Sequence, residues 1–151
     1  MSVKEITKSL KTVYDGQPWY GNNLLDILSI IESGNPNANL NGGNSLGQVL
    51  EHMMQWKRFT IEKIKGNESF HIELNSFQDW NKGKIYTQKE FTELIRNFKT
   101  ACEGLIDFLN DKENSFLESS AYKKYSNKTL IVGSIQHDIY HAGQLALLKN
   151  G

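Results

Sequence analysis

The chain has little cysteine and no excess of either charge, and both shortages exclude classes of protein. Cys102 is its single cysteine, so no disulfide can form within the chain. Because Cys102 lies on the apolar side of a predicted helix, a small buried core residue is favoured over a reactive thiol. Lysine plus arginine and aspartate plus glutamate number 17 each. A chain without a net positive field is not expected to bind nucleic acid.

Long apolar runs are also missing. No stretch approaches the roughly 20 apolar residues that cross a bilayer, and the opening Met-Ser-Val-Lys-Glu-Ile lacks the apolar stretch of a secretory signal. We therefore expect a cytoplasmic protein with no membrane partner. The sequence likewise offers no glycine-rich phosphate loop, no recognisable Ser-His-Asp constellation and no cofactor fingerprint.

The apolar spacing predicts one all-α domain that spans residues 1–151. The segments with helical spacing are 3–14, 46–64, a helix that begins after Thr87 and has its last apolar residue at Leu109, and a last helix that reaches Lys149. Residues 24–31 form a shorter apolar piece. A capping-box pattern begins at Ser45 and again at Thr87. Ser126 or Thr129 can cap the last helix.

Three connections have no helical spacing. Residues 34–44 are rich in asparagine and glycine, which predicts a surface loop. Residues 65–86 are long for a compact domain, and their Phe77 and Trp80 argue for packing rather than disorder. We expect this segment to cover one end of a helical bundle, and residues 110–127 to form a second polar connection.

The last helix is apolar on both sides. One face carries Leu130, Ser134, His137, His141, Gln144, Leu145 and Leu148, and the opposite face carries Val132, Ile135, Ile139 and Ala146. Such a helix is buried nearly all round. One side should face the bundle interior, and the other should lie under neighbouring segments or form a subunit interface, so we expect a homodimer.

Two histidines on this helix, His137 and His141, are four residues apart and project from one face, about 6 Å apart along the axis. They can grip one metal ion but leave it under-coordinated, so a third ligand is needed. His52 lies beside the apolar stripe of the 46–64 helix and can face inward, although such a histidine alone is more often a hydrogen-bonded boundary residue. His71 lies in the long connection, where a structural role is favoured.

Four motifs follow one another along the chain. They are Gln17-Pro-Trp-Tyr-Gly-Asn-Asn-Leu-Leu, Asn44-Ser-Leu-Gly-Gln-Val-Leu-Glu-His-Met-Met-Gln-Trp56, Asp79-Trp80 and His137-Asp-Ile-Tyr-His-Ala-Gly-Gln-Leu-Ala-Leu-Leu148. In this order they resemble the DinB-like (YfiT-type) metal-binding superfamily over nearly the whole chain. The last motif is the most specific, and the histidine followed by tryptophan in the second is the next.

The resemblance implies a four-helix bundle with up-down-down-up topology, commonly dimeric, in which three histidines hold a divalent ion. By position these ligands are His52, His137 and His141. Members with assigned activities include thiol S-transferases that use bacillithiol or mycothiol, and a thiol-dependent isomerase.

Three neutral imidazoles leave a coordination position for water or substrate, which is the pattern of a catalytic site. A bound thiol or water would become a nucleophile at neutral pH. Gln144 and Tyr140 are candidate catalytic residues near His141 that could contact substrate or orient a ligand, and a packing or supporting role is an equally good interpretation of both. Asp138 points about a quarter turn away from His137 and is not expected to be the base. Zinc and nickel suit imidazole ligands best, and iron and manganese are compatible.

The leading hypothesis is a metal-dependent enzyme that transfers a low-molecular-weight thiol of the bacillithiol type to an electrophilic small molecule. A metal-dependent hydrolase is the first alternative. The second is a non-catalytic dimeric bundle that binds a structural metal or a ligand, and an empty site in a pure interaction module is a third.

Overall fold

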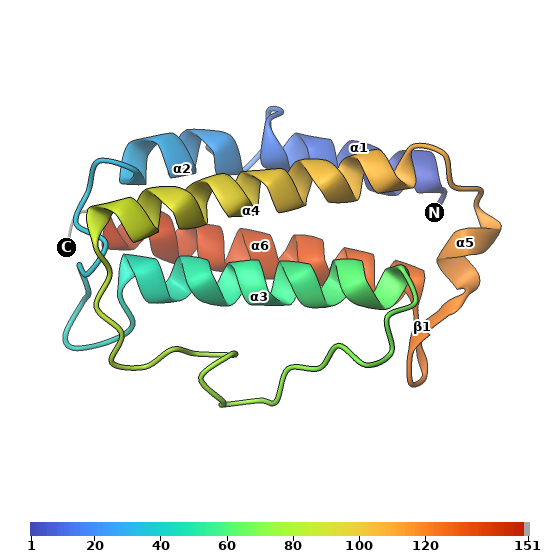
Figure 1. Ribbon diagram of the computed structural model, residues 1–151. Coiled ribbons are helices and arrows are strands. Elements are labelled where there is room, and N and C mark those ends of the chain that lie inside the picture. Colours follow the sequence, from blue (N-terminus) through green and yellow to red (C-terminus); the bar gives the residue numbers. More distant parts are fainter. Residues whose placement is uncertain (150–151) are drawn as a thin grey trace.

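The chain folds as an all-helical bundle with one small hairpin (Figure 1). The computed structural model describes residues 1–149, apart from the side chain of Ala121. The elements are α1 (Val3–Tyr14), α2 (Leu24–Ile31), α3 (Leu46–Ile64), α4 (Gln88–Leu109), α5 (Ser115–Glu118), β1 (Ser120–Tyr122), β2 (Tyr125–Ser126) and α6 (Asn127–Leu148). The four long helices lie side by side around one core, and α6 packs most extensively on α3.

The helix starts follow from side-chain caps that the sequence predicts. Capping boxes form at Ser45, which opens α3, and at Thr87, which opens α4. Ser126 rather than Thr129 caps α6, because its hydroxyl accepts from the backbone N–H of Thr129. A third capping box at Ser2 opens α1.

The core is built from the apolar faces of the helices. Its fully buried side chains include Ile6, Leu28, Leu50, Met53, Phe91, Phe98, Leu105 and Leu145. Cys102 is buried among them, as expected, and burial raises the pKa of its thiol to about 12. The thiol therefore stays protonated and unreactive at neutral pH.

The long connection of residues 65–86 runs back along α3 instead of covering an end of the bundle (Figure 1). As the connection proceeds, it contacts α3 residues progressively nearer the start of that helix. Glu68 contacts Lys63, Asp79 contacts Trp56, Asn81 contacts Gln48 and Tyr86 lies against Gly47. Trp80 packs against the core as expected. Phe77 does not, since 74% of it is exposed.

The connection of residues 110–127 contains short elements that the sequence does not predict. The single turn of α5 and the antiparallel pair β1–β2 occupy it. A four-residue helix and strands of two or three residues are too short to show a periodic apolar pattern.

The second apolar side of α6 is only partly covered. Ile139 and Ala146 line an open pocket of about 220 Å³ together with Ile27 and Ile30 of α2 and Tyr20. Other large apolar side chains remain exposed nearby in sequence, namely Trp19, Tyr140 and Leu147. No helix within residues 1–149 is both long and apolar enough to span a membrane.

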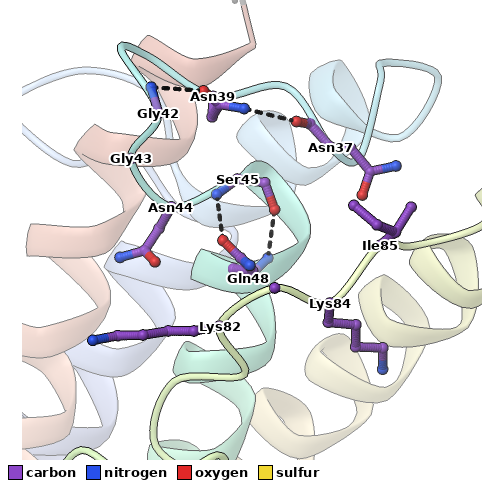
Figure 2. A pocket seen from close by; sticks show the side chains of 11 residues that line it. Asn37, Asn39, Gly42, Gly43, Asn44, Ser45, Gln48, Lys82, Lys84 and Ile85 are labelled. Carbon is purple, nitrogen blue, oxygen red and sulfur yellow. Dashed lines mark hydrogen bonds between the residues drawn. The ribbon is translucent and has the colours of Figure 1, made fainter.

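A polar cleft of about 460 Å³ lies where the 34–44 loop and the end of the long connection meet the start of α3 (Figure 2). Its amides join these segments. Asn37 exchanges hydrogen bonds of 2.8 and 2.9 Å with the backbone of Tyr86, and Gln48 donates to the carbonyl of Asn81 at 3.2 Å. Because these amides already have protein partners, we regard the cleft as a joint between loops rather than a ligand site.

Candidate metal centre

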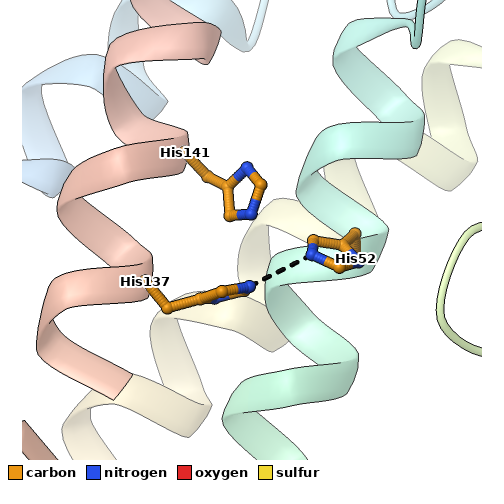
Figure 3. Close-up of side chains that lie close together, drawn as sticks. All are labelled: His52, His137 and His141. Carbon is orange, nitrogen blue, oxygen red and sulfur yellow. Dashed lines mark hydrogen bonds between the residues drawn. The ribbon is translucent and has the colours of Figure 1, made fainter. Parts of the chain in front are cut away.

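Three histidines from two neighbouring helices converge between α3 and α6 (Figure 3). His52 comes from α3, and His137 and His141 come from successive turns of α6. One ring nitrogen from each lies within 4.8 Å of the others, and the Nε2 atoms of His52 and His137 are 3.1 Å apart. The structure thus brings together the three histidines that the family resemblance implies as metal ligands. His71 is exposed in the long connection and takes no part.

His52 is held by the residue opposite it in the long connection. Its Nδ1 lies 2.7 Å from the backbone oxygen of Asp79 and 3.1 Å from the carboxylate Oδ1. Both partners are acceptors, so Nδ1 carries the proton and Nε2 presents a lone pair to the other two histidines. The indole of Trp80 stacks on the His52 ring at 3.7 Å between centroids and covers its outer face.

Asp79 is itself fixed on both oxygens. Oδ1 accepts from Trp56 Nε1 at 2.8 Å, and Oδ2 accepts from the backbone N–H of Asn75 at 2.8 Å. This buried carboxylate ties the long connection to α3 directly behind a proposed ligand. Reasoning from the residues missed this role, and its only trace was the Asp79-Trp80 pair among the family motifs.

His141 is oriented within its own helix. Its Nδ1 donates to Gln144 Oε1 at 2.6 Å, which turns Nε2 toward the cluster. Gln144 therefore touches a proposed ligand, which agrees with the orienting interpretation of this residue. Tyr140 packs edge-on against the His141 ring at 4.9 Å, but 67% of it is exposed.

Burial keeps these imidazoles neutral. It lowers the pKa of His52 and of His141 below the usual range. The pKa of His137 falls to about 3, first because of burial and then because His141, His52 and Lys57 would repel a positive charge there. Neutral imidazoles are the form that binds a metal ion.

The donor set fits a divalent ion. Imidazole nitrogens that share a tetrahedral zinc ion, at bonds of about 2.0–2.1 Å, lie about 3.3 Å apart, close to the 3.1 Å between His52 and His137. Three nitrogen donors without a thiolate or carboxylate suit zinc or nickel. His52 and His141 are buried and His137 is partly exposed, so the cluster reaches solvent beside His137.

Asp138 turns away from the cluster, as its position on the helix predicts. It pairs with Lys57 of α3 in the interior of the bundle. A buried lysine has no sequence signature, because this residue type is almost always exposed. The pair was therefore not predicted.

Comparison with known proteins gives a family but no near relative. The family model described as the DinB family matches residues 7–149. No curated protein and no solved structure matches the chain.

Proposed function

The chain belongs to the DinB family, and from that membership we propose that it is a metal-dependent enzyme that transfers a low-molecular-weight thiol to an electrophilic small molecule. The observation that carries the proposal is the convergence of three neutral imidazoles within 4.8 Å. Bacillithiol is the proposed type of thiol, and the proposed metal is zinc or nickel.

Each residue of the site has a defined part in this proposal. His52, His137 and His141 would hold the ion, which when bound supplies the Lewis acidity that lowers the pKa of a thiol or water. Asp79 and Gln144 fix the tautomers of His52 and His141. The exposed Tyr140 ring would contact a substrate that approaches the cluster.

The bundle topology and the oligomeric state extend the proposal. We propose the up-down-down-up order for the four long helices. The 65–86 connection supports it, because it returns the chain to the start of α3, so that α4 begins at the same end as α3 and runs parallel to it.

We also propose a cytoplasmic homodimer. The exposed Trp19, Ile30 and Leu147, together with the partly covered side of α6, support an apolar subunit interface.

Metal content tests the site first. Freshly purified wild type should hold about one divalent ion per chain by elemental analysis, and His137→Ala should lose it. His71→Ala is the matched control, since His71 is an exposed histidine outside the cluster. Equal metal in His137→Ala and wild type would refute the assignment.

Ligand binding then separates the functions. Metal-loaded protein is screened by thermal shift with bacillithiol, mycothiol, glutathione and coenzyme A, because a bound ligand raises the melting temperature. Stabilisation by a thiol that disappears in His137→Ala supports thiol transfer. Metal-dependent hydrolysis without thiol binding would favour the hydrolase, and metal with neither activity would favour a structural site.

A further inference from the structure

A lysine and an aspartate form an ion pair deep between α3 and α6. Lys57 is 2% exposed and Asp138 is 3% exposed, and Lys57 Nζ lies 2.5 Å from Asp138 Oδ2. The same ammonium donates to the hydroxyl of Ser134 at 2.8 Å. Two α6 acceptors one helical turn apart therefore hold one α3 donor.

Stability alone does not account for this pair. Removing two charges from water is costly, and buried ion pairs are often matched or surpassed by apolar side chains of similar volume. The second carboxylate oxygen, Asp138 Oδ1, has no hydrogen-bond partner within the described residues. The adjoining cavity, lined also by Cys102 and Tyr14, measures only about 10 Å³. The interior thus keeps an incompletely satisfied pair where an apolar contact would fit.

The position of the pair suggests what it provides. Asp138 directly follows His137 in the sequence, and Ser134 lies one helical turn before Asp138. Lys57 lies five residues after His52 on α3. Apolar side chains tolerate small slides of one helix past another, but an ammonium held by two specific acceptors does not. A slip by one helical turn, about 5.4 Å, would leave both charges buried without partners.

From this arrangement we infer that Lys57, Asp138 and Ser134 are positioning residues that fix the register of α6 on α3 so that His137 meets His52. This inference rests on the proposed metal centre, because the register matters for the ligands that it aligns. Burial opposes charge on both partners: it raises the pKa of Asp138 and counters the Asp138 carboxylate, which nevertheless helps to raise the pKa of Lys57.

The test removes the pair without leaving a lone charge. In Lys57→Met/Asp138→Leu apolar side chains of similar shape replace both charges, so we expect the variant to fold and its urea midpoint to stay close to that of wild type. Cobalt(II) is the probe, since its visible absorption reports the geometry of its ligands. The double variant should bind cobalt at least ten-fold more weakly, with a shifted absorption spectrum. Met53→Leu is the control for a neutral core change on α3 and should leave both unchanged.

The outcomes distinguish the inference from the function on which it rests. Wild-type affinity and spectrum in a folded double variant would overturn the register role. If the double variant does not fold, Ser134→Ala provides the test, because it removes one acceptor of Lys57 without creating a lone charge. Ser134→Ala should shift the cobalt spectrum. An unchanged spectrum would overturn the inference. Failure of wild type to bind cobalt would instead overturn the metal centre.

Discussion

Gln144 decides which nitrogen of His141 faces the cluster. Replacing it by leucine removes the acceptor for Nδ1–H and frees the ring to rotate. Such outer partners of metal-binding histidines typically contribute 10–100-fold to metal affinity, so we expect Gln144→Leu to weaken zinc binding by about that factor, measured by competition with a chromophoric chelator.

Two further variants complete this prediction. Gln144→Glu keeps an acceptor of greater basicity and should bind zinc at least as tightly as wild type. Gln136→Leu changes an exposed glutamine on the same helix and should have no effect. If all three variants bind zinc equally, Gln144 does not orient His141.

Single residues differ in how far the sequence reveals their place. The spacing of His137 and His141 fixes their common face on a helix, and the position of His52 beside an apolar stripe allows it to face inward. Asp79 and Lys57 could not be found in this way, because their partners lie 23 to 81 residues away in the chain. Only the packing of α3 against the long connection and against α6 brings those pairs together.

The end of the long connection packs closely on α3 because residue 47 is a glycine and has no side chain. Gly47 lies against the Tyr86 ring, and a Cβ there would fall 2.4 Å from a ring carbon. We expect Gly47→Ala to lower the free energy of unfolding by about 1–3 kcal/mol through overpacking, measured by urea denaturation.

Gly104 is the matched control. It is exposed within α4, and a Cβ there would meet no neighbouring atom. Gly104→Ala should therefore raise the free energy of unfolding by about 0.5–1 kcal/mol through helix propensity. Stabilisation by both substitutions would show that Tyr86 can move aside and does not anchor the loop.

Elements were predictable where they are long and periodic. The predicted helices 3–14 and 46–64 agree with α1 and α3 at both ends, and α2 coincides with the shorter apolar piece of residues 24–31. The path of residues 65–86 was not predictable. It is fixed by hydrogen bonds to α3, such as that from Trp56 to Asp79, rather than by an internal pattern.

For the whole molecule, the proposed ion is a cross-link between α3 and α6. A ligand that binds only the folded state at 100 times its dissociation constant adds about 2.7 kcal/mol of stability. In a domain of this size about 1 kcal/mol moves the melting temperature by roughly 2–4 °C. We therefore expect chelation by EDTA to lower the melting temperature by about 5–10 °C, measured by calorimetry.

The reversal of this change identifies its cause. Zinc added in excess should restore the melting temperature of wild type, whereas His137→Ala should respond neither to EDTA nor to zinc. A wild type indifferent to EDTA after verified loss of metal would show that the ion does not bridge the two helices.

The separation of 85 residues between His52 and His137 also matters during synthesis. At translation rates of about 5–20 residues per second, α3 emerges roughly 4–17 s before the turn of α6 that complements it. Throughout that interval Lys57 has no carboxylate from α6, and a bare ammonium resists burial. We therefore expect α3 to dock on α6, and the three histidines to meet, only after α6 has left the ribosome.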